Sequence, residues 1–145
     1  MKLIGQGVVP ETFIDSNLHM NIKHYFGIIS DGTHEYVTNT DLSIILDGVN
    51  KSFVITKILS FFHKEMNTND EWSLFAGLYK INLAGFSLMY DLRFKDTRSA
   101  KFYARCNYFD LSTRKSYQIT PDLLISLKLD VITSLHDPLS NEQTK

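Results

Sequence analysis

Apolar and polar residues alternate along two segments in the second half of the chain, as is typical of β-strands with one buried face. The apolar face of the first segment comprises Phe86, Leu88, Tyr90, Leu92 and Phe94, and that of the second comprises Phe102, Ala104, Cys106 and Tyr108. Two longer apolar segments, 53–62 and 72–81, predict further strands. Turn-forming residues at 67–70, 83–85 and 110–115 separate these strands, so the pattern indicates an antiparallel sheet.

The first third of the chain has a helical pattern instead. Apolar residues recur mainly every three or four positions, at Ile22, Tyr25, Phe26, Ile29, Tyr36 and Val37, which predicts a helix over about 21–37. Gly27 and Gly32 weaken this helix by about 1 kcal/mol each relative to alanine. A short helix or turn is expected at 41–46, ended by Asp47-Gly48, and Pro121 is suited to begin another helix.

The element order is therefore a strand, a long helix, and four or five antiparallel strands. With 10 Phe and 7 Tyr, the sheet must bury at least one face. Wrapping the sheet around the long helix achieves this, so we expect an α+β fold. We expect one domain over 1–136, followed by a flexible tail over 137–145.

Composition and charge exclude several classes of function. A net charge of -1 gives no electrostatic basis for binding nucleic acid. No segment approaches the roughly 20 apolar residues of a membrane span, and the lone Cys106 allows no internal disulfide, so a cytoplasmic location is expected. The sequence has no zinc-ligand spacing, nucleophile elbow or phosphate-binding glycine loop, so we predict neither a metal nor a cofactor.

Polar residues capable of catalysis gather just before the long helix, in the segment Asp15 to Asn21. A helix N-terminus offers free backbone N–H groups and a partial positive charge, which polarise a carbonyl beside a carboxylate. The structural alternative is that Asp15, Asn17 and Asn21 only form turns or cap the helix, and that His19 is an ordinary satisfied histidine. A metal site built from Asp15, His19 and His24 is a minor alternative.

The spacing of Asp15, His19, Asn21 and Tyr25 resembles the motif of the hot-dog-fold acyl-CoA thioesterases, the 4-hydroxybenzoyl-CoA thioesterase-like proteins. The segment from Pro10 to Asn21 is especially similar to the betainyl-CoA and dehydrocarnitinyl-CoA branch, and 104–124 resembles the family's last hairpin and closing helix.

The resemblance implies a hot-dog fold, a homodimer or dimer of dimers, and hydrolysis of a small or medium acyl-CoA. It implies that Asp15 is the general base or nucleophile and that Asn17, His19 and Asn21 orient the reacting groups. Ile22, His24 and Tyr25 are expected to bind the substrate, with backbone N–H groups of 22–24 holding the oxyanion.

Leu18 stands where the family motif has glycine, so a catalytically silent hot-dog domain that binds acyl-CoA or a protein is the main alternative. A third hypothesis is an RNA-binding module that uses the aromatic and basic residues of 101–109.

Overall fold

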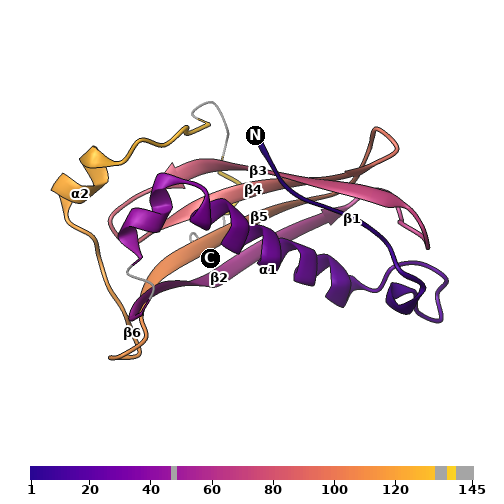
Figure 1. Ribbon diagram of the computed structural model, residues 1–145, viewed down its shortest axis with the longest axis horizontal. Coiled ribbons are helices and arrows are strands. Elements are labelled where there is room, and N and C mark those ends of the chain that lie inside the picture. The colour runs from indigo at the N-terminus through magenta and orange to yellow at the C-terminus, as the bar shows by residue number, and fades with distance from the viewer. Residues whose placement is uncertain (47–48, 133–136, 140–145) are drawn as a thin grey trace. The chain divides into compact units, whose positions relative to one another are not determined.

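The computed structural model describes residues 1–46, 49–132 and 137–139. These residues form strands and helices arranged as Figure 1 shows, with six strands and two α-helices in the described ranges. The elements follow in the order β1 (Lys2–Val8), a 3-10 helix (Glu11–Phe13), α1 (Ile22–Thr38), a second 3-10 helix (Asp41–Ile45), β2 (Lys51–Phe62), β3 (Glu71–Ile81), β4 (Gly85–Phe94), β5 (Thr97–Asp110), β6 (Lys115–Ser116) and α2 (Pro121–Ser126).

The strands form one sheet in the order β1-β3-β4-β5-β2, with β6 paired to β5. β1 runs antiparallel to β3, with Gly7 opposite Trp72. The predicted long helix, the four long strands and the turns between them are confirmed, and the α+β class with them. The short 41–46 helix is a 3-10 helix, and the Asp47-Gly48 end expected for it lies outside the described residues.

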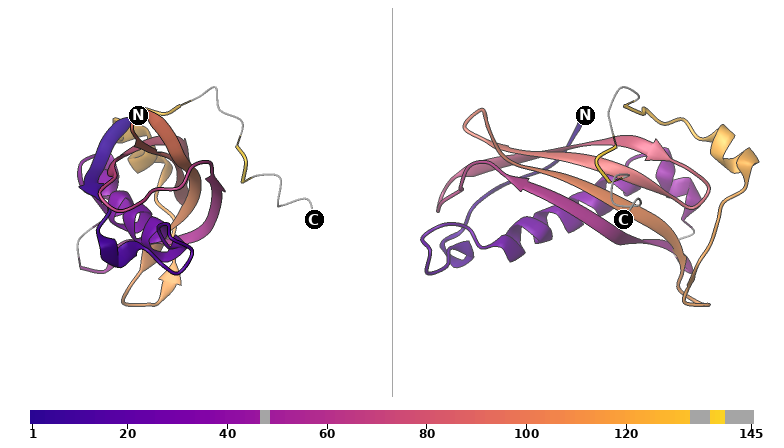
Figure 2. Two further views of the ribbon diagram at one scale, coloured as in Figure 1. Left: turned by 90° about the vertical axis from the view of Figure 1, so that its right-hand side faces the viewer. Right: turned by 180° about the vertical axis from the view of Figure 1, so that it is seen from behind.

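The chain forms two compact units, each containing part of the sheet. Unit 1 comprises residues 1–36, 60–76 and 90–102, and unit 2 comprises residues 37–59, 77–89 and 103–145. The loop between β1 and α1, with its short 3-10 helix, lies in unit 1 at the N-terminal end of α1 (Figures 1 and 2).

In unit 1, α1 contacts all five long strands. Its aromatic residues meet two of them, since the ring of Tyr25 lies 5.2 Å from that of Phe62 on β2 and the ring of Phe26 lies 6.4 Å from that of Phe102 on β5. Thr33 shares a 2.5 Å hydrogen bond with the Tyr90 hydroxyl on β4. A Cβ at Gly32 would reach Leu74 on β3 and Ile4 on β1. The sheet of this unit therefore curls around the helix, as predicted.

β4 departs from the expected pattern of one buried and one polar face, because both of its faces are covered. Ser87 is only 2% exposed and Asp91 only 8%. In unit 1, Asp91 is held by Arg98 Nε at 2.7 Å and by Arg93 at 2.9 Å. In unit 2, Met89 packs in a cluster with Tyr79, Tyr103 and Leu139. Polar residues therefore alternate with apolar ones along β4 although both faces are buried, because Asp91 on the second face is covered by the charged side chains of Arg93 and Arg98.

The apolar face predicted for β5 is confirmed, because Phe102, Ala104, Cys106 and Tyr108 are all fully buried. Tyr103, on the other face, is also buried. The aromatic residues that the RNA-binding hypothesis requires to stack on bases are thus largely inside the protein. Of the expected flexible tail, 140–145 lies outside the described residues, and the domain boundary at 136 stays a prediction.

Candidate functional site

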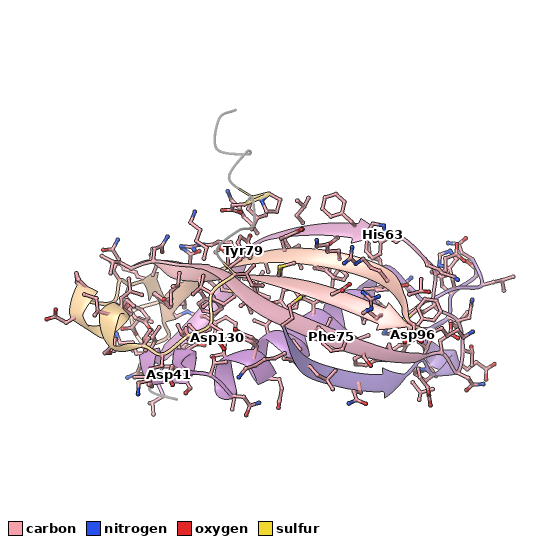
Figure 3. The ribbon with its side chains drawn as sticks, turned by 90° about the horizontal axis from the view of Figure 1, so that it is seen from above. Asp41, His63, Phe75, Tyr79, Asp96 and Asp130 are labelled. Carbon is pink, nitrogen blue, oxygen red and sulfur yellow. The ribbon has the colours of Figure 1, made fainter. Side chains whose placement is uncertain are left out.

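The polar segment before α1 lines a cavity of about 570 Å³ in unit 1. Two stretches of chain form its walls, 15–25 around the start of α1 and 62–65 directly after β2. Figure 3 labels His63, which immediately follows the last residue of β2. Six of the seven predicted site residues line this cavity: Asp15, Asn17, His19, Asn21, Ile22 and Tyr25.

A tight hairpin turn presents Asp15 to this cavity. Ile14 pairs with Met20, the Asp15 N–H donates to the His19 carbonyl at 3.3 Å, and the Leu18 N–H donates to the Asp15 carbonyl at 3.0 Å. Leu18 has a φ of 67°, the left-handed conformation that three-residue hairpin loops commonly require and glycine adopts most easily. The turn therefore forms without the family's glycine. The Leu18 side chain is 78% exposed and lies outside the cavity lining.

Two N–H donors fix the Asp15 carboxylate. Its Oδ1 accepts the Asn17 backbone N–H at 2.8 Å, and its Oδ2 accepts the Asn21 side-chain amide at 2.9 Å. The bond from Asn17 does most to lower the pKa of Asp15, followed by the bond from Asn21. Burial raises this pKa by less than these two bonds lower it, and the charge of His19 lowers it slightly further. Asp15 is therefore ionised at neutral pH, half-buried and oriented.

Asn21 also caps the N-terminus of α1, as the structural alternative predicted, in addition to its contact with Asp15. Its Oδ1 accepts the Lys23 N–H at 3.0 Å, and its carbonyl accepts the His24 N–H at 3.0 Å. These bonds occupy two of the backbone donors expected to bind an oxyanion. Of the three N–H groups of 22–24, that of Ile22 has no acceptor among the residues that the structure describes.

His19 and Tyr25 border the cavity without touching the Asp15 carboxylate. His19 Nε2 lies 3.9 Å from Glu65 Oε1, which links the two walls of the cavity. Tyr25 is buried, and its ring packs edge-on against Phe62. These aromatic rings form an apolar wall near the polar residues, which suits the acyl part of a substrate.

His24 does not join the other predicted residues. Its ring stacks on Phe13 at 3.8 Å and 7°, in a separate cavity of about 480 Å³ in unit 1. Successive residues of an α-helix are rotated by about 100° about its axis, so Ile22 and Tyr25 lie on one face of α1 and His24 lies on another. The structure therefore does not bring His24 to Asp15. In the described ranges, no group of three or more His, Cys, Asp or Glu residues is placed to hold a metal ion.

The second wall of the cavity was not expected from the sequence; it is formed by Phe62, His63, Lys64 and Glu65. The His63 and Lys64 N–H groups both donate to the Ser99 carbonyl, and the Met20 N–H donates to the Met66 carbonyl at 3.1 Å. The available signal was three consecutive polar residues directly after an apolar strand. Their partners are distant in sequence, so the pattern alone did not link them to Asp15.

Solved structures with the same fold include several described as thioesterases. A probable thioesterase from Escherichia coli has 18% sequence identity and a TM-score of 0.72, with 82% of this chain and 91% of that chain covered. A predicted thioesterase from Bacillus stearothermophilus has 15% identity and a TM-score of 0.71, covering 88% of this chain and 96% of that one.

A further neighbour, from Staphylococcus aureus and determined in complex with CoA, has 18% identity and a TM-score of 0.72, covering 86% of this chain and 80% of that one. No protein-family model and no curated protein matches the sequence. At these identities the likeness establishes the hot-dog fold. Among the residues that the structure describes, no helix is long and apolar enough to cross a membrane.

Proposed function

We propose that the chain is an acyl-CoA thioesterase and that Asp15 is its catalytic carboxylate. The observation that carries this proposal is the pair of N–H donors that hold an ionised Asp15 in a cavity beside the start of α1. The fold shared with structures described as thioesterases, one of them in complex with CoA, supports the proposal.

In the proposed reaction, the thioester carbonyl lies near Asp15 with its oxygen toward the Ile22 N–H. Asp15 either attacks the carbonyl carbon, forming a mixed anhydride that water then hydrolyses, or takes a proton from the water that attacks. In both routes the C–S bond breaks and CoA leaves as a thiolate, which takes up the proton held by Asp15 in the general-base route and a proton from water in the nucleophilic route. The Ile22 N–H stabilises the negative charge that develops on the carbonyl oxygen.

The other site residues have supporting roles. Asn21 fixes one carboxylate oxygen and Asn17 the other, while His19 lies where it can orient water or the carbonyl. Tyr25 and Phe62 provide an apolar wall for the acyl group. A cavity of about 570 Å³ is suited to a small or medium acyl chain. The betainyl-CoA branch rests on the sequence motif alone, and the structural neighbours do not support it.

The test is hydrolysis of a panel of acyl-CoA thioesters, from acetyl and betainyl to palmitoyl, with free CoA measured by chromatography. Wild-type protein should hydrolyse at least one of them, and Asp15→Asn should reduce turnover by roughly 10²–10⁴-fold because it removes the base or nucleophile. Asn17→Ala is the matched control, since Asn17 holds Asp15 through its backbone N–H. Equal turnover by Asp15→Asn and wild-type protein would refute the assignment.

We also propose, from the family resemblance, that the chain forms a homodimer. β2 lies at one end of the strand order and exposes several apolar side chains, which supports an association through this strand. These side chains are Val54, Ile55, Ile58, Phe61 and Phe62. Sedimentation equilibrium should give twice the chain mass, and Ile58→Lys should shift the protein toward monomer. The cytoplasmic location stays a prediction.

A second candidate function is a catalytically silent domain that binds acyl-CoA. The lowered pKa of Asp15 favours it, because a carboxylate with a low pKa is a weak proton acceptor. This candidate predicts equilibrium binding of acyl-CoA with no release of free CoA by wild-type protein.

A further inference from the structure

Unit 2 contains a polar cavity of about 350 Å³ that the proposed thioesterase site does not use. Residues of β2, β3, β4 and β5 line it, so its floor is part of the sheet. This volume is ample for a small anion.

The charged lining of this cavity is mainly positive. Lys57, Lys80 and Arg105 contribute three positive charges and Asp137 one negative charge, so the lining carries 3 − 1 = +2. The whole chain has a formal charge of -1, so this concentration of positive charge is local. Neighbouring cations repel one another, and this repulsion is relieved when an anion binds between them.

Two of the cations, Lys57 and Arg105, are half-buried and have no carboxylate partner among the residues that the structure describes. Within the described ranges, the guanidinium of Arg105 donates to uncharged oxygens, Asn82 Oδ1 at 2.8 Å and Ser87 Oγ at 3.5 Å. These two bonds use two of its five N–H donors and leave three. Lys57 makes no ion pair with any residue that the structure describes. Partial burial makes an unpaired charge more costly than full exposure does, so an anion between these two cations would be stabilising.

Neutral donors complete the arrangement. Asn107 Oδ1 accepts the Thr56 hydroxyl at 3.0 Å, which orients the Asn107 amide group. In the described part of unit 2, the amide nitrogen of Asn107 has no acceptor, so its donors remain available. Together with the guanidinium fork of Arg105 and the ammonium of Lys57, it provides donors of the kinds that bind phosphate oxygens.

Asp137 places a carboxylate at the same cavity. Its oxygens accept the Tyr79 hydroxyl at 3.1 Å and approach Lys80 Nζ at 3.4 Å. Burial, and then the charge of Asp137, raise the pKa of Tyr79, so its hydroxyl remains a donor to this carboxylate. Asp137 thus partly neutralises Lys80 and leaves Lys57 and Arg105 for a ligand.

We propose that this cavity binds the phosphate group of a small ligand, with Arg105 and Lys57 as the principal contacts and Asn107 as a neutral donor. A phosphate or pyrophosphate group matches the +2 lining in charge and the Arg105 fork in geometry. This site shares no residue with the Asp15 site, because all its residues belong to unit 2. If the phosphate is that of CoA, the site also deepens the proposed function.

The test is titration calorimetry of the intact protein with inorganic pyrophosphate at low ionic strength. Wild-type protein should bind, and Lys57→Gln and Arg105→Gln should each weaken binding about tenfold or more, since each removes a charged hydrogen-bonding group. Asp137→Asn should tighten binding a few-fold because it removes the competing negative charge. Lys2→Gln, which removes an exposed lysine in unit 1, should leave the affinity unchanged.

Circular dichroism should show that the variants remain folded. If Arg105→Gln unfolds because its bonds to Asn82 and Ser87 are lost, Lys57→Gln decides the question. Absence of pyrophosphate binding by wild-type protein, or equal affinities for Lys57→Gln and Lys2→Gln, would overturn the proposal.

Competition identifies the source of the phosphate. If CoA displaces pyrophosphate and pantetheine does not, the site holds the phosphates of CoA. If pyrophosphate binds undiminished at saturating CoA, the site serves a separate phosphorylated ligand. Either result supports a phosphate site at Lys57 and Arg105, and neither depends on whether Asp15 catalyses hydrolysis.

Discussion

Asn21 joins the Asp15 carboxylate to the first turn of α1. Its amide nitrogen donates to Asp15 Oδ2 at 2.9 Å, while its amide oxygen accepts the Lys23 N–H at 3.0 Å. One side chain therefore both caps the helix and sets the position of Asp15 relative to the Ile22 N–H. Loss of this side chain should affect both helix stability and the proposed chemistry.

We predict that Asn21→Ala lowers kcat at least tenfold and shifts the acidic limb of the pH–rate profile to higher pH. The shift follows because the variant removes a hydrogen bond that lowers the pKa of Asp15. Loss of the cap should also cost about 1 kcal/mol of stability. Asn17→Ala is the control and should leave the profile unchanged, because its backbone N–H remains. Identical profiles for wild-type protein and Asn21→Ala would show that Asn21 does not set the state of Asp15.

Leu18 provides a test of backbone strain. The left-handed conformation of Leu18 costs a non-glycine residue roughly 1–2 kcal/mol, a cost that glycine avoids. Glycine also makes the unfolded chain more flexible, which offsets part of this gain in stability. Leu18→Gly should therefore raise the free energy of unfolding by about 1 kcal/mol, measured by urea denaturation. Leu18→Ala, which keeps the strain, should give no such gain. Because the Leu18 side chain lies outside the cavity lining, we expect turnover to change less than threefold. Large activation by Leu18→Gly would show that this residue limits catalysis.

The two glycines of α1 should respond in opposite ways to alanine. A Cβ at Gly27 would have no neighbour within 4 Å, so Gly27→Ala should stabilise the helix by about 1 kcal/mol. A Cβ at Gly32 would lie 2.6 Å from Leu74 Cδ2 and 2.9 Å from Ile4 Cδ1, so Gly32→Ala should destabilise the protein by about 1–3 kcal/mol. Thermal unfolding of the pair measures this difference. Equal stabilisation by both would mean that α1 does not pack against β1 and β3 as described.

Stability should fall in acid partly because of Asp91. Burial alone would raise the pKa of Asp91, but hydrogen bonds and charge from Arg98 and Arg93 outweigh it and lower the pKa. A carboxylate whose pKa is lower in the folded state stabilises the protein above its unfolded pKa of about 3.9. That stability disappears as the pH falls through the lower folded value. Asp91→Asn should cost about 2 kcal/mol at pH 7 and flatten the acid side of the stability curve. An unchanged slope below pH 4 would contradict this role.

The fold was largely predictable because its periodic patterns are strong. The spacing of Ile22, Tyr25 and Ile29 located α1, and the alternation of Phe102, Ala104, Cys106 and Tyr108 located β5. The second buried face of β4 was not predictable, because it includes the charged residue Asp91. Asp91 is buried by Arg93 and Arg98, and Arg98 comes next to it only when β4 and β5 pair in the folded sheet.

The site was predictable only where its residues are local in sequence. Asp15, Asn17 and Asn21 meet within one hairpin turn, so their spacing carried the information. The chain 62–65 reaches the cavity through its bonds to Ser99, a contact between distant segments. His24 was expected to bind the substrate together with Ile22 and Tyr25, but it lines the other cavity of unit 1, because it lies on another face of α1. Its role in substrate binding stays a prediction.

The most direct test of the proposed function is the initial rate of CoA release at saturating concentration of the best acyl-CoA, for wild type, Asp15→Asn and Asn17→Ala together. We predict turnover by wild type and Asn17→Ala, and a loss of roughly 10²–10⁴-fold in Asp15→Asn with the fold intact. Turnover by Asp15→Asn at the wild-type rate, or no turnover by wild type with any thioester of the panel, would contradict catalysis by Asp15.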